Sequence, residues 1–140
     1  MGNIGEMTRR PAQLGIRLRI DFGPASSLGP GKVALLEHIG ASGSLSQAAR
    51  ELGMSYRRAW QLLDSLNHCF RERVAVTAKG GRRGGGATLT AFGRELIRTY
   101  RDFDAEIQAR AARHFRPLLR QARSRGMTRK VAPIVRLSDR

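Results

Sequence analysis

The chain has 140 residues, with 26 Lys plus Arg against 11 Asp plus Glu, which gives a formal net charge of +15. This length suits one domain with a modest core, and a balance this basic indicates a polyanionic partner, either nucleic acid or an anionic membrane face. Because no apolar run approaches the ~20 residues of a membrane span and the start lacks the apolar core of a secretory signal, we expect a cytoplasmic protein without a membrane partner.

Strict alternation over residues 14–22 predicts the first element, after a flexible N-terminus over residues 1–13. A period of two is typical of a strand with one buried face. The side chains predicted on that face are Leu14, Ile16, Leu18, Ile20 and Phe22. The Gly, Pro and Ser content of residues 23–31 then predicts a loop, and a helix follows over about residues 32–41.

Two short helices joined by a tight turn come next. Ser44 begins a capping box, in which its hydroxyl accepts from the N–H of Gln47 and the Gln47 side chain reaches back to the N–H of Ser44. Gly53 ends this helix at a left-handed position, and Ser55 caps the following one. The order predicts a helix-turn-helix; the alternative is an ordinary alanine-rich helix.

The second of these helices has one apolar and one polar face. The stripe that we expect to face the core consists of Ala59, Leu62, Leu63, Leu66 and Phe70. Arg57 and Gln61 lie on the opposite face, with Arg58 and Trp60 beside it. Arg pairs bidentately with guanine and Gln with adenine, so the helix is typical of one that reads bases in the DNA major groove. The alternative is a solvated charged face.

A glycine- and arginine-rich hairpin follows. Residues 73–78 and 87–89 are strand-like, and KGGRRGGG separates them at 79–86. Glycines allow a close approach to a sugar-phosphate backbone, while Lys79, Arg82 and Arg83 supply charge for phosphates or an A·T-rich minor groove. A phosphate loop of the Walker type is excluded because no Lys-Ser or Lys-Thr follows the glycines. Residues 14–90 are therefore predicted to form a winged helix-turn-helix domain, mainly α with a small β wing.

A long helix is predicted over residues 91–116, capped by Thr90. The helix is longer than the winged helix-turn-helix domain can cover, so we expect part of its apolar stripe to pack on a second subunit. The predicted dimer interface is Leu96, Tyr100, Phe103 and Ile107. The alternative is a helix folded back on its own domain. Pro117 is expected to end or kink the helix, and the basic residues 117–140 are expected to be a mostly disordered tail that adds non-specific DNA affinity.

Enzyme and metal signatures are missing from the sequence. His38, His68 and His114 have no metal-ligand spacing, the single cysteine allows no Cys/His cluster, and Ser, His and Asp form no recognisable catalytic arrangement. We therefore expect a protein that is not an enzyme, with no cofactor, no catalytic residues and no metal site.

Residues 28–111 resemble the N-terminal DNA-binding domain of the molybdate-responsive ModE regulators. The resemblance rests on S-Y-x-x-A-W at 55–60, on T-x-K-G-G-x-x-G-G-G at 77–86 and on FGRELI at 92–97. It implies a dimeric winged helix-turn-helix protein that controls transcription, often by repression, of molybdenum uptake or molybdoenzyme genes. The predicted DNA-contacting set is Ser46, Gln47, Ser55, Tyr56, Arg57, Arg58, Trp60, Gln61, Lys79, Arg82 and Arg83.

The sequence departs from the full-length family after Phe115. Family members continue into β-rich domains that bind molybdate, whereas no run of strand-like segments follows here. We expect no molybdate binding by this chain, and a signal-sensing protein is a further candidate partner. The resulting hypothesis is a dimeric, sequence-specific regulator of double-stranded DNA that acts as a repressor. A sequence-tolerant nucleoid or RNA-binding protein and a direct oxyanion sensor remain the alternatives.

Overall fold

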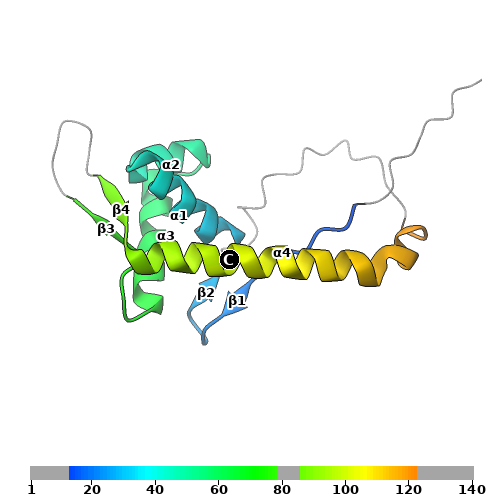
Figure 1. Ribbon diagram of the computed structural model, residues 1–140. Coiled ribbons are helices and arrows are strands. Elements are labelled where there is room, and N and C mark those ends of the chain that lie inside the picture. Colours follow the sequence, from blue (N-terminus) through cyan, green and yellow to red (C-terminus); the bar gives the residue numbers. More distant parts are fainter. Residues whose placement is uncertain (1–12, 79–85, 123–140) are drawn as a thin grey trace, which may run out of the picture.

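A computed structural model describes residues 13–78 and 86–122 of the chain. The helices of this part are α1 (Pro30–Ser42), α2 (Leu45–Glu51), α3 (Tyr56–Cys69) and α4 (Ala91–Leu119). The strands are β1 (Ile20–Asp21), β2 (Ser27–Leu28), β3 (Ala75–Thr77) and β4 (Ala87–Leu89), paired antiparallel as β1–β2 and β3–β4. Helices α1–α3 form a head, the β3–β4 hairpin projects from it as the wing, and α4 crosses the head and continues beyond it (Figure 1). The predicted winged helix-turn-helix with a long C-terminal helix is confirmed.

The core lies between α1, α2 and α3. Leu35, Leu36 and Ile39 of α1 are fully buried against the apolar stripe of α3. The stripe matches the prediction except at its end, where Phe70 is only partly buried because it lies beyond the last turn of α3. Burial of such side chains stabilises the head by about 25 cal/mol per Å² of apolar surface removed from water.

Three of the helices have an N-cap residue with a side-chain hydroxyl group. Ser44, Ser55 and Thr90 each accept a hydrogen bond from the backbone N–H three residues later, at 3.0–3.1 Å. The caps of Ser44, Ser55 and Thr90 are therefore confirmed. The reciprocal half of the predicted capping box is wrong, because Ser42 Oγ accepts the N–H of Ser44 at 3.2 Å and leaves no need for Gln47.

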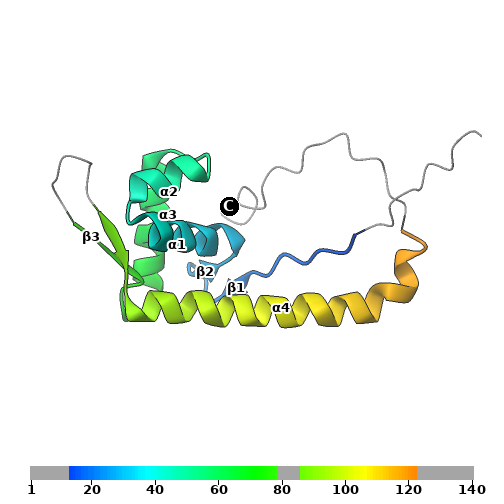
Figure 2. The ribbon, with the colours of Figure 1, turned by 45° about the horizontal axis from the view of Figure 1, so that its top comes forward.

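The N-terminal segment is extended but is not the nine-residue strand predicted over 14–22. Only β1 pairs with another strand, since the turn into β2 leaves the preceding residues without a strand beside them. They run along α4 instead (Figure 2). There Gln108 bonds both backbone groups of Ile16, at 3.0 and 2.6 Å, and the Tyr100 hydroxyl donates to the carbonyl of Leu18 at 2.7 Å. The predicted alternation is found over residues 13–21 as a half-buried and an exposed side, but Phe22, predicted on the buried side, is exposed.

Helix α4 has 29 residues, which makes it about 43 Å long at 1.5 Å per residue. An ion pair between Arg101 and Glu37 joins its middle to α1. Of the two expectations for Pro117, an end of the helix is wrong, because the helix continues to Leu119. A proline removes one backbone donor, and here only the last turn is affected. None of the helices in the described ranges is long and apolar enough to cross a membrane.

The start of α4 is locked against the chain that leads into β3. Thr90 donates its N–H to the carbonyl oxygen of Val74 at 3.0 Å, and its hydroxyl donates to the carbonyl of Arg73 at 2.6 Å. Gly93 faces the same backbone, and a Cβ atom added to it would lie 2.0 Å from the Val74 oxygen. The close approach of helix and strand therefore requires glycine at this position.

Gly93→Ala is expected to lower the free energy of unfolding by about 1–3 kcal/mol, because the added methyl group pushes α4 away from Val74. At a helical position where the methyl group meets no other atom, Gly→Ala would raise the free energy of unfolding by about 1 kcal/mol. The direction of the change in stability therefore shows whether Gly93 is in close contact with Val74. Urea unfolding measures the effect. Gly15→Ala is the control, since a Cβ there meets nothing within 4 Å. Equal stability of the two variants would contradict the locked start of α4.

Candidate nucleic-acid interface

Close packing of α2 on α3 determines which side chains of α3 face outward. Helix α2 packs against α3, and Ala48 and Ala49 of α2 and Ala59 of α3 are all buried in the core that the two helices share. Gly53 adopts the left-handed conformation at φ 67°, and the N–H of Met54 donates to the carbonyl of Ala49 at 3.0 Å. After this turn α3 begins with Ala59 in the core and with Tyr56, Arg57 and Trp60 exposed to solvent.

The outer face of α3 carries two rows of side chains, each with two members one helical turn apart. Arg57 and Gln61 form a polar row, and both are exposed. Tyr56 and Trp60 form an aromatic row, and they are 56% and 49% exposed although they are large and apolar. Residues four apart lie side by side on a helix, so each row presents a continuous strip of about one turn. All four belong to the predicted DNA-contacting set.

The other predicted site residues of the helix-turn-helix are less accessible to a binding partner, because they are half-buried or already hydrogen-bonded. Ser55 is exposed, but its hydroxyl is the cap of α3. Ser46 and Arg58 are half-buried. Gln47 is half-buried too, and its amide bridges Glu51 at 3.0 Å and Arg50 at 2.7 Å. Gln47 is therefore held on α2 by its neighbours in this structure.

The Glu51 side chain, which bonds Gln47 within α2, also links α2 to α1. His38 Nδ1 lies 2.6 Å from a Glu51 carboxylate oxygen. That hydrogen bond, together with the one from Gln47, lowers the pKa of the Glu51 carboxyl below its ordinary value. The carboxylate is thus kept ionised beside the side chains that hold α2 in place.

Asn67 fixes the wing against α3. Its Oδ1 accepts the N–H of Val74 at 2.8 Å, and its Nδ2 donates to the carbonyl of Ala75 at 3.2 Å. On the other strand, the N–H of Ala87 donates to the carbonyl of Gly43 at 2.9 Å. Asn67 was not among the predicted site residues, and its only sequence signal is a polar residue next to the apolar stripe of α3. The predicted wing residues Lys79, Arg82 and Arg83 lie outside the described residues.

One acidic side chain lies on the outer face of α3. Asp64 is half-buried two turns after the start of the rows, and its carboxylate is 3.5 Å from His68 Nδ1. A carboxylate repels DNA phosphates, so it favours contact through the first two turns of α3 only. The arginine and glutamine side chains that suit base edges lie within those two turns.

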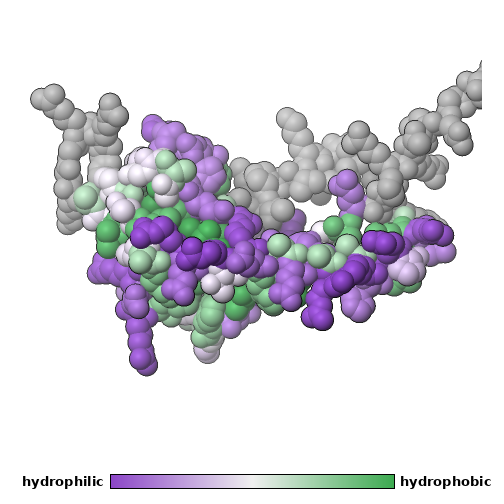
Figure 3. All heavy atoms as spheres, viewed as in Figure 1, coloured by the Kyte–Doolittle hydropathy of each residue, from purple (hydrophilic) through white to green (hydrophobic). Residues whose placement is uncertain are grey.

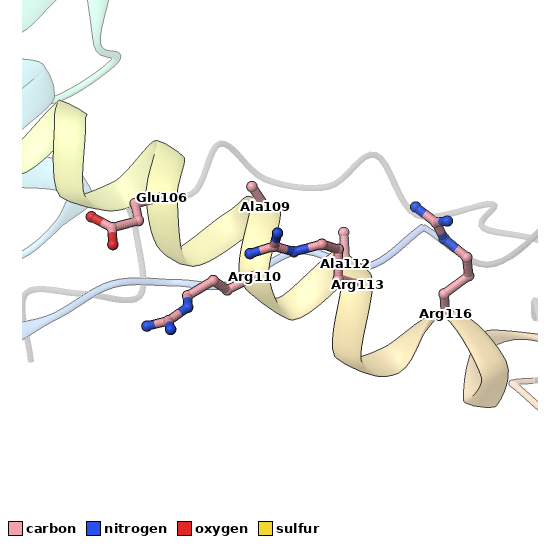
Figure 4. Close-up of a pocket in the computed structure, with 6 residues that line it drawn as sticks. All are labelled: Glu106, Ala109, Arg110, Ala112, Arg113 and Arg116. Atoms are coloured by element: carbon pink, nitrogen blue, oxygen red, sulfur yellow. The ribbon is translucent and has the colours of Figure 1, made fainter.

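A second basic surface lies on the outer half of α4, where Figure 3 shows strongly hydrophilic side chains. A shallow hollow of about 590 Å³ is lined there by Glu106, Ala109, Arg110, Ala112, Arg113 and Arg116. In Figure 4 the three arginines project outward from the helix. Three guanidinium groups against one carboxylate suit a polyanion, and the open form does not enclose a small substrate.

The predicted dimer stripe on α4 is divided by the fold. Tyr100 is only 2% exposed and belongs to its own chain's interior, while Leu96 is half-buried and packs against the same core. Burial raises the pKa of the Tyr100 hydroxyl, with Asp104 adding to the effect. Ile107 is half-buried, and Phe103 is 42% exposed. Of the four residues, Phe103 therefore offers most apolar surface to a partner.

The outward-facing α3, the turn before it and the hairpin beside it define a winged helix-turn-helix module, the class of fold in which one helix enters the DNA major groove. Homologous proteins carry the ModE and Mop names. The chain is 43% identical over 82 residues to the DNA-binding transcriptional dual regulator ModE of Escherichia coli K12, 59% of this chain and 31% of that protein. No family model matches the chain.

Two further relatives bear names that refer to molybdenum. The molybdenum transport protein ModE of Azotobacter vinelandii is 36% identical over 93 residues, 66% of this chain and 34% of that protein. The molybdenum-pterin-binding protein MopB of Rhodobacter capsulatus is 44% identical over 80 residues, 57% of this chain and 30% of that protein. The resemblance to ModE is confirmed, and this chain contains a ModE-like domain. The chain spans about a third of the length of these relatives.

Asn67→Ala is expected to destabilise the fold by about 1–3 kcal/mol, because it leaves the N–H of Val74 and the carbonyl of Ala75 without their partner. Asn67→Asp is the matched variant: it keeps the acceptor for Val74 but places a carboxylate oxygen against the carbonyl oxygen of Ala75, so it tests the bond to Ala75 alone. Thermal unfolding ranks the three proteins. If both variants are as stable as the parent, Asn67 does not hold the wing.

Proposed function

We propose that this chain is a sequence-specific double-stranded DNA-binding regulator of transcription. The observation that carries the proposal is the exposed polar row, Arg57 and Gln61, at the start of a helix whose other face is buried in the core. Arg and Gln are the side chains that pair bidentately with guanine and adenine in the major groove. The net charge of +15 supports a nucleic-acid partner and accelerates its encounter.

The relatives support a narrower role. One of them is named a DNA-binding transcriptional regulator, and two others bear names that refer to molybdenum. We propose that this chain is a cytoplasmic repressor of genes concerned with molybdenum, and that it acts through binding and not as an enzyme. Sequencing of the DNA fragments that it retains in cells tests which genes these are.

A homodimer is the second part of the proposal. Helix α4 extends well beyond the head, and Phe103 lies exposed on it while Ile107 beside it is half-buried. A second copy that covers Phe103 would remove this aromatic surface from water. Two heads related by a two-fold axis would then read two half-sites.

Arg57→Ala is expected to weaken binding to the preferred duplex by about 1–3 kcal/mol and to relax the base preference at one position, because a bidentate contact is lost. The affinity for a random duplex should change much less. Fluorescence anisotropy with both duplexes measures the difference.

The control for this variant is Arg71→Ala, which removes an exposed arginine beyond the opposite end of α3. It should affect both duplexes alike. Equal losses on the two duplexes in the Arg57→Ala protein would make Arg57 a phosphate contact. They would then favour a sequence-tolerant nucleic-acid-binding protein over a regulator that reads bases.

Phe103→Asp is expected to give a monomer where the parent protein is a dimer, because it places a charge in an apolar seam. Light scattering at micromolar concentration measures the mass. Ala105→Asp is the control on the opposite side of the helix and should remain dimeric. A parent protein that is itself a monomer would contradict this part of the proposal.

A further inference from the structure

The aromatic row of α3, Tyr56 and Trp60, is not needed by the core. The stripe that fills the interior lies on the other side of the helix, and both aromatic side chains are about half exposed. The described ring-to-ring contacts of the head join Phe22, Phe70 and Phe92 at 5.2–5.3 Å, and they occur near the opposite end of α3. Neighbouring exposed aromatic side chains of this size mark an interaction surface.

The aromatic row lies on the side of α3 that faces the wing. Asn67 follows Trp60 by close to two full turns of helix, so both residues lie on the same side. Asn67 is the residue that bonds the backbone of Val74 and Ala75 at the base of the wing. The order across the interface is therefore the polar row, then the aromatic row, then the hairpin.

The position of the row limits what it can contact. When the polar row faces base edges, the aromatic row faces the edges of adjacent bases in the same groove. The apolar group presented there is the C5 methyl of thymine, whereas the other base edges present hydrogen-bond donors and acceptors. The apolar part of an aromatic ring makes no hydrogen bond with those polar groups, whereas it gains apolar burial from a methyl group.

We propose that Tyr56 and Trp60 read thymine through its C5 methyl group, so that the preferred site of this protein carries thymines beside the bases contacted by Arg57 and Gln61. This inference rests on the proposed function and adds the class of base that the aromatic row selects. The Tyr hydroxyl and the Trp indole N–H remain at the rim, where they can donate to phosphate oxygens.

Replacement of thymine by uracil tests the proposal, because uracil keeps the hydrogen-bonding groups and lacks only the methyl. The preferred duplex is first selected from a random pool, and each thymine is then replaced singly. The unmodified protein should lose about fourfold in affinity for each contacted methyl, the effect of one buried CH₂-sized group. The double variant Tyr56→Ala with Trp60→Ala should bind the thymine and uracil duplexes equally well.

Two control proteins accompany the test. Phe115→Ala removes a similarly exposed aromatic side chain from α4 and should keep the full response to uracil. Trp60→Gln removes the ring but leaves a long side chain on α3, and it should lose the response at the methyl beside Trp60 alone. Thermal unfolding of each variant shows whether its head remains folded.

The outcomes separate this inference from the proposed function. If selection yields no preferred duplex, the proposed function fails. If a preferred duplex is found and uracil substitution leaves the affinity of the unmodified protein unchanged, the function stands and the thymine inference is wrong. A uracil effect that persists in the double variant also overturns it, because another side chain then contacts the methyl.

Discussion

The packing of α2 against α3 is the contact on which the surface that we propose to face DNA depends. Ala48, Ala49 and Ala59 are buried in the core that the two helices share, and the left-handed Gly53 makes the short turn between them possible. Because the apolar stripe of α3 is buried in the core, the opposite face of the helix points outward. A larger side chain at these positions would rotate or displace α3, and with it the polar and aromatic rows.

Much of this arrangement follows from local sequence rules. The hydroxyl caps at Ser44, Ser55 and Thr90 and the spacing of the α3 stripe are local features, and each predicts its element without knowledge of the whole fold. Long-range pairings are different. The segment before β1 alternates like a strand, yet Gln108 and Tyr100 of α4 bond its backbone where a strand would have done so. Both side chains are far away in the sequence.

The candidate site shows the same division. The spacing of the apolar residues on α3 predicts the outward positions of Arg57 and Gln61, with Trp60 beside them, whereas Tyr56 belongs to the motif on which the resemblance rests. The role of Asn67 depends on the position of β3, which no pattern around residue 67 encodes. The dimer stripe was predicted from helical periodicity alone, and periodicity does not distinguish the chain's own core from a partner. Tyr100 belongs to the core and Leu96 packs against it, because the first part of α4 crosses the head.

The charge of the chain and the shape of α3 contribute differently to binding. A net charge of +15 attracts any duplex, so affinity alone does not show that bases are read. The most direct measurement is therefore the ratio of the dissociation constants for a random duplex and for a duplex selected from a random pool, both at physiological salt. Reading by the rows of α3 predicts a selected consensus and a ratio of about 10³ or more. A pool that shows no enrichment, with a ratio near one, would contradict the account.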